Sequence, residues 1–268
     1  MEARSALFDL YGDHLRTRDG RAPVAALVRM LAPLEIAAPA VRTAVSRMVR
    51  QGWLAPTRVA SGPGYMITPK AARRLTDAAA RIYRTDALTW DGTFELIIID
   101  PATPRSRRMR IGSGLAYLGY GRIGDDTWVA ARASAEAAPI LAESGVRFDR
   151  FAARYAGPGA RAAMVARAWD IDELADRYRS FIDDMRRVVG PVATNADART
   201  AFTARFRLVH AWRTFLFRDP SLPAEVLPAR WPGTRAAAFF DEHQARLRPG
   251  ADAFVDECLD GGLLKEAS

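Results

Sequence analysis

Proline and glycine divide the first ninety residues into short segments, each of which suits one regular element. Pro23 fits the first position of a helix, and Pro33 ends that helix. Pro39 then begins another helix, which stops at Gly52, a residue favoured just beyond helix ends. Two short helices joined by a tight turn form the core of a helix-turn-helix, so this is the arrangement that the spacing predicts.

The flanking segments extend the same pattern. A helix capped by Ser5 is expected before these two helices, because its apolar residues share one face. Two strand-like segments follow, at residues 53–59 and 65–68, and a hairpin directly after the second helix would be the wing of a winged helix. Thr68 can then cap a long basic helix over residues 69–84. We therefore predict a winged helix-turn-helix with a linker helix over residues 1–88.

The helix that starts at Pro39 has two chemically distinct sides when its residues are placed at about 100° intervals. One side is apolar: Val41, Ala44, Val45, Met48 and Val49. The other side is polar and has no acidic residue: Arg42, Thr43, Ser46, Arg47 and Arg50. Guanidinium groups can reach guanine edges or phosphates, and small hydroxyls allow close approach to the groove. This pattern favours a DNA-recognition helix, although an ordinary amphipathic surface helix is the alternative interpretation.

The positive charge of the chain is concentrated in the same region. Residues 1–88 hold 14 Lys and Arg against 7 Asp and Glu, a net charge of +7 out of +8 for the whole chain. Such a distribution is typical of a polyanion-binding module attached to nearly neutral domains. Only Lys70 and Lys265 are lysines. A biased genome composition explains why arginine is used in place of lysine, but it does not explain why the positive charge is concentrated in residues 1–88.

The middle of the chain predicts a second type of domain. After the boundary Trp90-Asp91-Gly92 we expect a strand, a helix, two strands, a helix and a strand, at residues 94–99, 105–118, 120–123, 127–131, 135–143 and 146–155. This βαββαβ order is that of a ferredoxin-like domain, assigned here to residues 89–157. One face of such a sheet takes the helices, and an edge strand often pairs in dimers.

Beyond Gly157-Pro158-Gly159 the pattern is helical, so residues 158–268 are expected to form an α-helical effector and dimerisation domain. Residues 219–233 hold four prolines and predict an ordered connection, with further helices at 234–247 and 251–259. The fold class is therefore α+β. Aromatic residues recur here at helical spacing, which usually marks a core and less often lines a ligand pocket.

Several functional classes lack the residues that they need. Cys258 is the single cysteine, so an internal disulfide and a cysteine-based zinc site are excluded. The three histidines and the absence of a GxSxG motif identify no catalytic nucleophile with its base, so no catalytic residue, cofactor or metal is expected. No apolar run reaches the roughly 20 residues of a membrane helix, and the N-terminus does not resemble a signal peptide, which makes the cytoplasm the expected location.

Two alternatives stay open. The middle domain resembles a small ferredoxin-like nuclease in which an aspartate at the end of the first strand binds a metal ion, and Asp100 holds that position. An aspartate before a proline is, however, also a common residue where a strand turns. A basic module could also belong to an RNA-binding adaptor. Sequence-specific binding to duplex DNA, as opposed to unselective binding to RNA, would distinguish a regulator from such an adaptor.

Motifs along nearly the whole chain resemble one known family. SALFDLYGDHLR, VRTAVSRMVRQGWL, YMITPKAARRL, WDGTFEL, VARAWDIDEL and VHAWRTFLFRDPSLPAEVLPARWPG are similar to segments of the PaaX-like regulators, the repressors of phenylacetic acid degradation. The resemblance implies a homodimeric repressor, not an enzyme. It further implies release from operator DNA on binding of an aryl-coenzyme A thioester such as phenylacetyl-CoA.

The resemblance supports the polar side of the recognition helix as the DNA-facing set, but the wing departs from the family. Its tip, residues 60–64, is Ala-Ser-Gly-Pro-Gly instead of basic or aromatic, which leaves Arg58 as the nearest candidate for a wing contact. For the effector, the predicted residues are Tyr178, His210, Trp212 and Arg213. Trp212 could stack on an aryl or adenine ring, Arg213 could meet a phosphate, and the other two could donate hydrogen bonds.

Overall fold

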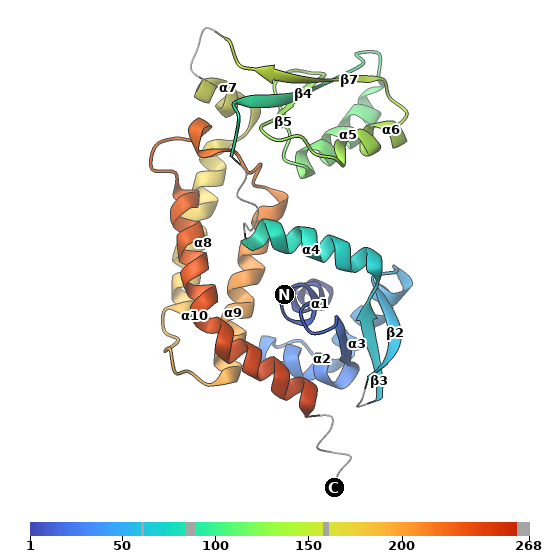
Figure 1. Ribbon diagram of the computed structural model, residues 1–268, viewed down its shortest axis with the longest axis vertical. Coiled ribbons are helices and arrows are strands. Elements are labelled where there is room, and N and C mark those ends of the chain that lie inside the picture. The colour runs from blue at the N-terminus through green and yellow to red at the C-terminus, as the bar shows by residue number, and fades with distance from the viewer. Residues whose placement is uncertain (60–61, 84–88, 158–160, 262–268) are drawn as a thin grey trace. The chain divides into compact units, whose positions relative to one another are not determined.

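The computed structural model describes residues 1–59, 62–83, 89–157 and 161–261. Within these residues the chain is a mixed α+β protein with two antiparallel sheets, as the sequence predicts (Figure 1). It divides into two compact units. Unit 1 comprises Met1–Asp86, Phe181–Arg213 and Ala237–Ser268, and unit 2 comprises Ala87–Ser180 and Thr214–Ala236. These units cut across the three consecutive domains expected from the sequence, because the C-terminal helical region contributes to both.

The N-terminal part of unit 1 alternates helices with a small sheet. Its elements are α1 (Ala3–Leu10), a π-helical turn η1 (Tyr11–Leu15), β1 (Arg21–Pro23), α2 (Val24–Leu31), a 3-10 turn η2 (Ala32–Leu34), α3 (Ala38–Arg50), β2 (Leu54–Val59), β3 (Gly62–Ile67) and α4 (Pro69–Tyr83). The strand order is β1-β3-β2, and both pairings are antiparallel. The two helices, the hairpin and the following helix thus lie within a few residues of their predicted positions.

Two local predictions are wrong. Ser5 does not cap the first helix, which already starts at Ala3 with Glu2 at the N-cap. Pro23 is predicted to be the first residue of a helix, yet residues 21–23 form strand β1 against β3. The close approach of these strands requires Gly64, because a Cβ there would lie 2.7 Å from the carbonyl oxygen of Ala22.

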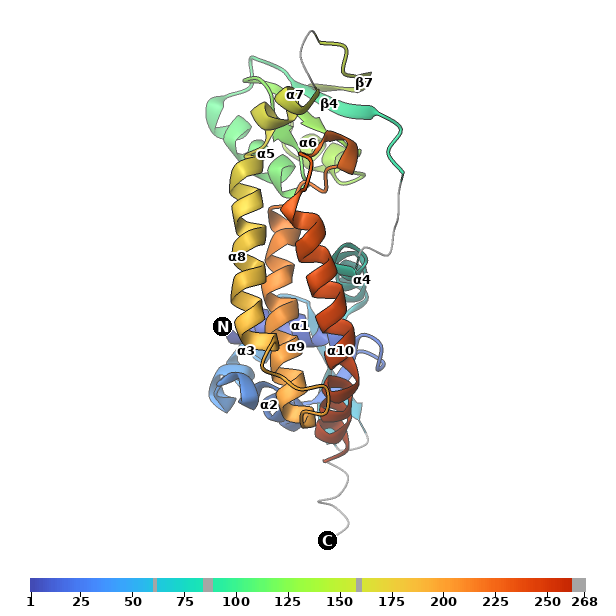
Figure 2. The same cartoon turned by 90° about the vertical axis from the view of Figure 1, so that its left-hand side faces the viewer.

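Three long helices complete unit 1. They are the part of α8 (Ile171–Val189) from Phe181, α9 (Ala198–Arg213) and the part of α10 (Pro232–Asp260) from Ala237, and within unit 1 they run side by side (Figures 1 and 2). The expected break between two helices near Pro249 is absent, since α10 continues through this proline. The helix bends instead (Figure 1), which is the usual effect of a proline inside a helix.

Unit 1 has one core that joins its N-terminal and C-terminal parts. Leu7, Leu10 and Leu27 are buried in it, and Phe202 of α9 and Val255 of α10 belong to the same cluster. At roughly 25 cal/mol for each Å² of apolar surface removed from water, such burial is the main stabilising contribution. The helices around α3 are thereby fixed to α9 and α10.

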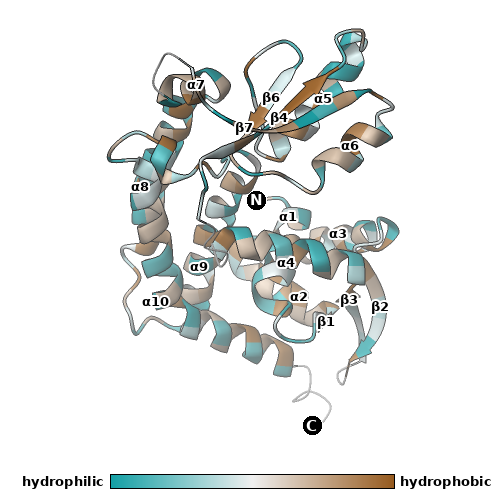
Figure 3. Ribbon diagram, turned by 45° about the horizontal axis from the view of Figure 1, so that its top comes forward, coloured by the Kyte–Doolittle hydropathy of each residue, from teal (hydrophilic) through white to brown (hydrophobic). Residues whose placement is uncertain are grey.

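Unit 2 contains the predicted βαββαβ order. Its elements are β4 (Thr93–Ile99), α5 (Arg105–Tyr117), β5 (Gly121–Arg122), β6 (Thr127–Ala130), α6 (Ala137–Glu143) and β7 (Phe148–Arg154), followed by α7 (Arg161–Ala168) and the short turns η3 (Thr214–Phe217) and η4 (Ala224–Val226). The sheet order is β5-β6-β4-β7. The central strand β4 is markedly hydrophobic (Figure 3), and residues on both of its faces belong to hydrophobic clusters.

The two faces of this sheet have different cores. Ile97 and Ile99 pack with Leu115 of α5 and Leu141 of α6. On the other face, Phe94 belongs to a cluster with residues of α7 and of the segment around η4. In the described part of the chain, no helix is both long and apolar enough to cross a membrane.

Candidate nucleic-acid interface

Helix α3 packs its apolar side against the preceding helices of unit 1. Val41, Val45 and Met48 are buried in the same core as Leu27 and Tyr11. The five predicted DNA-facing side chains lie on the opposite side, and all are exposed: Arg42, Thr43, Ser46, Arg47 and Arg50. The predicted division of this helix into two sides is therefore confirmed, while the contact of the exposed side with DNA stays a prediction.

Both ends of α3 are defined by local sequence. Pro39 lies in the first turn, where a missing N–H costs no hydrogen bond. Past the other end, Gly52 adopts a φ of 71°, the left-handed conformation that suits glycine. The hydroxyl of Thr68 donates to the carbonyl oxygen of Gly52 at 2.9 Å and accepts from the N–H of Ala71 at 3.2 Å. The predicted cap of α4 is thus confirmed, and it also ties α4 to the end of α3.

The exposed side of α3 has unopposed positive charge. None of its five residues is acidic. In the described part of the chain, no other residue forms a hydrogen bond or an ion pair with the guanidinium of Arg42, Arg47 or Arg50. A guanidinium group without an internal partner remains available for phosphates or base edges.

Further basic residues lie on the neighbouring elements. Arg58 of β2 is exposed and faces Pro63 across the hairpin. Lys70 and Arg73 are exposed in the first turns of α4, and Arg74 lies 5.8 Å from the ring centre of Trp53. The first two residues of the predicted wing tip, and Arg84, which the sequence places at the end of α4, lie outside the described residues.

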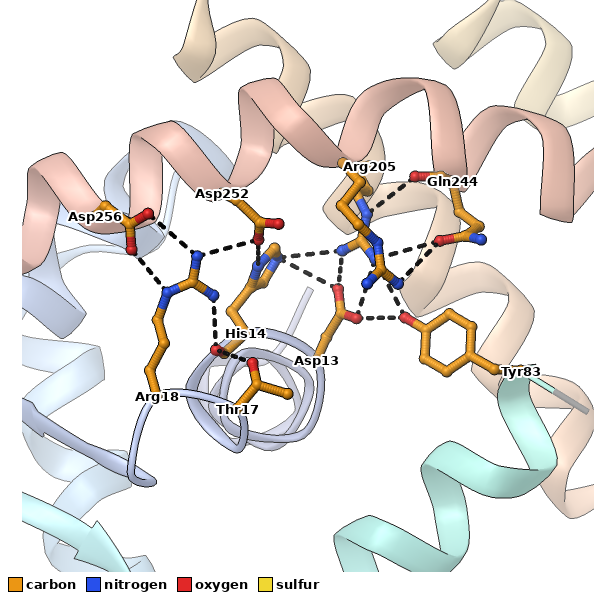
Figure 4. Close-up of polar contacts among 10 residues, drawn as sticks. Asp13, His14, Thr17, Arg18, Tyr83, Arg205, Gln244, Asp252 and Asp256 are labelled. Atoms are coloured by element: carbon orange, nitrogen blue, oxygen red, sulfur yellow. Dashed lines mark hydrogen bonds and ion pairs between the residues drawn. The ribbon is translucent and has the colours of Figure 1, made fainter. Parts of the chain in front are cut away.

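A largely buried polar cluster contains side chains of η1, α4, α9 and α10. We call it the Asp13 cluster: Asp13, His14, Tyr83, Arg205, Gln244 and Asp252 (Figure 4). Arg205 of α9 donates to both carboxylate oxygens of Asp13, and the Tyr83 hydroxyl of α4 donates to the same carboxylate. The Nε of Arg205 also donates to the carbonyl oxygen of Gln244 on α10 at 3.2 Å. The Asp13 carboxylate thus joins η1 to α4 and α9, and Arg205 extends the contacts to α10.

The histidine of the cluster is buried between two carboxylates. The Nε2 of His14 lies 3.3 Å from Asp13, and its Nδ1 lies 3.5 Å from Asp252 of α10. Arg18 continues the chain of contacts outward, because it forms ion pairs with Asp252 and Asp256 (Figure 4).

The charges of the cluster determine its protonation. Burial by itself raises the pKa of Asp13, but the positive charge of Arg205, the neighbouring His14 and the donated hydrogen bonds hold this pKa at about 2. Burial raises the pKa of Tyr83, and the Asp13 carboxylate raises it further. Asp13 is therefore ionised and Tyr83 is a neutral donor at neutral pH.

Two of the predicted effector residues contact a second buried carboxylate. Nδ1 of His210 lies 2.5 Å from Oδ2 of Asp9, and Nε of Arg213 lies 2.7 Å from Oδ1 of the same residue. Arg213 also donates to the hydroxyl of Ser5 at 2.8 Å. These side chains thus connect α9 to α1, and their role in ligand binding stays a prediction.

The other two effector candidates are aromatic residues with internal partners. Trp212 is buried in unit 1, stacks on Phe240 with ring centres 4.9 Å apart, and donates to the carbonyl oxygen of Ile82 at 3.1 Å. Tyr178 belongs to unit 2, where it stacks on Phe215 at 4.2 Å. Both rings have the surroundings expected of core residues.

A nuclease would depend on Asp100. The contacts of this residue are those of an aspartate in the turn that follows a strand. Its carboxylate accepts from the N–H of Ala102 at 2.8 Å and from Nε of Arg147 at 2.8 Å. These two hydrogen bonds, the first in particular, lower the pKa of Asp100. No group of three or more His, Cys, Asp or Glu side chains among the described residues has a geometry that could hold a metal ion.

Sequence reasoning missed the two buried carboxylates. Asp9 and Asp13 are four residues apart, and both lie on the apolar face of the first helical segment, where an acidic side chain needs a buried partner. That position was the available signal. The partners could not be inferred from it, because Arg205 and His210 lie about 200 residues away in the chain.

Models of one protein family match two parts of this chain. The model described as PaaX-like protein matches residues 2–71, and the model described as PaaX-like protein C-terminal domain matches residues 169–257. The first match includes α3, and the second includes Arg205, His210 and Arg213. Together they cover more than half of the chain.

Individual proteins are similar over nearly the full length. The transcriptional repressor PaaX of Escherichia coli is 30% identical over 262 residues, which are 94% of this chain and 83% of the relative. The uncharacterized protein Rv0674 from Mycobacterium tuberculosis has a solved structure that superposes with a TM-score of 0.58 at 23% identity, over 94% of this chain and 98% of that one. The first relative agrees with the expectation that this chain is a regulator and not an enzyme. The second relative shows that the two chains share a fold. The chain belongs to the PaaX-like family.

Proposed function

We propose that this protein is a transcriptional repressor that inserts α3 into the major groove of operator DNA. The observation that carries this proposal is the side of α3 on which Arg42, Arg47 and Arg50 are exposed and which contains no acidic residue. The E. coli relative, named a transcriptional repressor, supports it. In this interpretation α2, α3 and the β2–β3 hairpin form a winged helix-turn-helix, and Arg58 is the wing residue nearest to the backbone.

We further propose that the repressor acts as a homodimer. One recognition helix reads only a few base pairs, so two-fold symmetry doubles the contact and matches an imperfect palindrome. The half-sites are then expected about one helical turn apart, or a multiple of that distance. The βαββαβ unit, with strand order β5-β6-β4-β7, is proposed to be the ferredoxin-like domain of this assembly.

The effector is proposed to be an aryl-CoA thioester such as phenylacetyl-CoA, on the strength of the family relationship. Of the four predicted effector residues, His210 and Arg213 already contact Asp9. A ligand phosphate bound by Arg213 would compete with this carboxylate and loosen the link between α9 and α1. Ligand binding and the position of the DNA-reading helices would then be coupled.

Titration of phenylacetyl-CoA into the protein–operator complex, with free CoA as the control, tests the proposal. Operator affinity measured by fluorescence anisotropy should fall, and by linkage the operator should weaken acyl-CoA binding by the same factor. An operator affinity that no acyl-CoA changes would contradict the effector part alone. Equal affinity for operator and random duplex DNA would contradict sequence-specific repression.

A further inference from the structure

Two adjoining hollows lie on the surface of unit 2. The larger, with a volume of about 740 Å³, lies along α5, and the smaller, of about 410 Å³, is lined by β5 and the start of α8. They share Arg122 and Trp128 in their walls, so we call them together the Trp128 hollow. Six side chains of its wall can meet a charged aromatic ligand: Arg105, Arg108, Arg122, Trp128, Trp169 and Arg218. Volumes of this size are typical of small-molecule sites.

Glycine residues allow the backbone to lie directly against both tryptophan rings. A Cβ at Gly112 of α5 would lie 2.9 Å from Cζ2 of Trp128. A Cβ at Gly121 of β5 would lie 2.5 Å from Cε2 of Trp169, whose Nε1 also donates to the carbonyl oxygen of Gly119 at 3.1 Å. Both rings are only half-buried. Each indole is therefore held by the backbone on one side, while its remaining atoms line the hollow.

Arg122 and Trp128 place a charge and a flat ring at the same point. They lie directly opposite each other in the β5–β6 pairing, so their side chains project from the same face of the sheet. The carboxylate of Asp125 lies 2.8 Å from the guanidinium of Arg122, and both side chains are exposed. An exposed pair of this kind contributes little stability, so a phosphate can replace the carboxylate. The combination suits a ligand that has both a phosphate and an aromatic ring.

Each part of the hollow also has a guanidinium group without an internal partner. Arg105 lines the larger part and Arg218 the smaller part, and both are exposed. Among the residues that the structure describes, none forms a hydrogen bond or an ion pair with either guanidinium. Arg108, by contrast, is ion-paired with Asp126 at 2.6 Å. An anionic ligand gains most from Arg105 and Arg218, because no existing contact is lost when it binds them.

The acidic residues at the smaller part of the hollow already have partners within the chain. They are Asp170 and Glu173, at the start of α8. The carboxylate of Asp170 accepts from the N–H of Glu173 at 2.9 Å and so caps the helix. Glu173 in turn accepts from Nε of Arg177 at 3.0 Å. These carboxylates therefore leave the charge of Arg218 uncompensated.

Tyr178, one of the predicted effector residues, positions the segment that carries Arg218. Its hydroxyl donates to the carboxylate of Asp219, whose neighbours Arg218 and Pro220 both line the smaller part of the hollow. Its ring stacks on Phe215 with ring centres 4.2 Å apart. Tyr178 thus holds the residues beside the hollow in place.

We propose that the Trp128 hollow is the binding site of the aryl-CoA effector, with the phosphorylated nucleotide in the larger part and the acyl group in the smaller part. This inference rests on the proposed effector and assigns it a location. Three guanidinium groups line the larger part. Arg105 and Arg122 bind phosphate oxygens there, and the adenine stacks on Trp128. In the smaller part the aryl ring packs against Trp169, and Arg218 donates to the thioester carbonyl.

Isothermal titration calorimetry of the full chain without DNA tests the nucleotide end. Arg105→Glu should weaken the binding of both phenylacetyl-CoA and free CoA on the order of 10- to 100-fold, since it removes a charge-assisted hydrogen bond to a phosphate. Arg110→Glu is the matched control and should leave both affinities unchanged, because Arg110 is exposed on the same helix but does not line the hollow. Equal affinities of Arg105→Glu and the wild type would overturn the proposal.

The acyl end has a different signature in the same titrations. Arg218→Gln should weaken phenylacetyl-CoA binding about 10-fold but leave the affinity for CoA unchanged, because free CoA has no thioester carbonyl. An equal loss for the two ligands would contradict the placing of the acyl group. Arg213→Gln separates this site from the Asp9 contact. A loss of CoA affinity in Arg213→Gln but not in Arg105→Glu would place the nucleotide outside the hollow.

Operator release distinguishes a defective effector site from a misfolded protein. In fluorescence anisotropy, Arg105→Glu should bind operator DNA as tightly as the wild type, but its release should need more phenylacetyl-CoA by the same factor as the loss of affinity. If the wild type binds phenylacetyl-CoA and Arg105→Glu and Arg218→Gln bind it equally well, the effector stands and this location fails. If the wild type binds neither CoA nor phenylacetyl-CoA, the proposed effector fails as well, whereas operator binding still reports on the repressor function.

Discussion

Arg205 of α9 forms a buried ion pair with Asp13 of η1, 192 positions away in the chain. Tyr83 of α4 donates to the same carboxylate, so the last turn of α4 is attached to the same point (Figure 4). The carboxylate of Asp13 therefore links the N-terminal segment η1 and helix α4 to the C-terminal helix α9. Because both partners are almost fully buried, neither can exchange the other for water without a large cost.

Replacing Arg205 with methionine should destabilise unit 1 by roughly 3–5 kcal/mol, since Asp13 would remain buried without its counter-ion. Arg207→Met is the matched control, because Arg207 is exposed on the same helix, and it should change stability by no more than about 0.5 kcal/mol. The double variant Asp13→Leu, Arg205→Met should recover much of the loss. Urea unfolding followed by circular dichroism measures all three, and equal stability of Arg205→Met and wild type would show that the pair is not structural.

Acid should weaken this contact in a defined pH range. The pKa of Asp13 is about 2 in the folded protein and 3.8 for an unperturbed aspartate, so folding favours the ionised form. The stabilisation is complete above about pH 4 and is lost as the pH falls from 4 to 2. At about 1.4 kcal/mol per pKa unit, it amounts to on the order of 2 kcal/mol.

The variant Asp13→Asn isolates this contribution, because it has no group that titrates at this position. Between pH 4 and pH 2 the free energy of unfolding of the wild type should fall by about 2 kcal/mol more than that of the variant. Parallel pH profiles of the two proteins would contradict the low pKa of Asp13.

The sequence predicts those parts of the structure that depend on neighbouring residues. The limits of α3 follow from Pro39 and Gly52, and its exposed side follows from the spacing of the arginines. The cap formed by Thr68 and the element order of unit 2 are local patterns of the same kind. Here nearby residues determine the outcome, so a single sequence is sufficient.

Contacts between distant segments could not be predicted in this way. Nothing near Asp9 or Asp13 identifies Arg213 or Arg205 as the partner, and nothing in residues 21–23 indicates pairing with β3. Pro249 predicts a helix break from local rules, yet α10 continues through it, and the next residue, Gly250, packs against α9. A Cβ at Gly250 would lie 2.7 Å from Cβ of Ala201, so tertiary packing outweighs the local preference.

Asp100→Ala should leave operator affinity unchanged, and the wild type should not cleave DNA in the presence of Mg²⁺ or Mn²⁺. The reason is that the Asp100 carboxylate is occupied by the N–H of Ala102 and by Arg147 at the exit of β4. Incubation of supercoiled plasmid with the protein and each metal ion measures cleavage. Metal-dependent nicking that Asp100→Ala abolishes would establish a nuclease in place of the regulator proposed above.

Arg47→Ala should lower operator affinity by roughly 1–3 kcal/mol and relax selectivity at one base position, if its guanidinium makes two hydrogen bonds to a guanine. The fold should be unaffected, because Arg47 is exposed and lies opposite the packed residues Val45 and Met48. Anisotropy titrations against the operator, against single-base variants of it and against random duplex DNA measure both effects.

Arg207→Ala removes the same charge from an exposed position of α9 and is the control for net charge. It should weaken binding to every duplex far less than Arg47→Ala weakens operator binding. An equal loss on operator and random DNA for Arg47→Ala would assign Arg47 to a phosphate, and the dependence of log affinity on log salt would then decrease by about one. No loss on any duplex would remove Arg47 from the reading side of α3, and Arg42 and Arg50 would become the residues to test for base contacts.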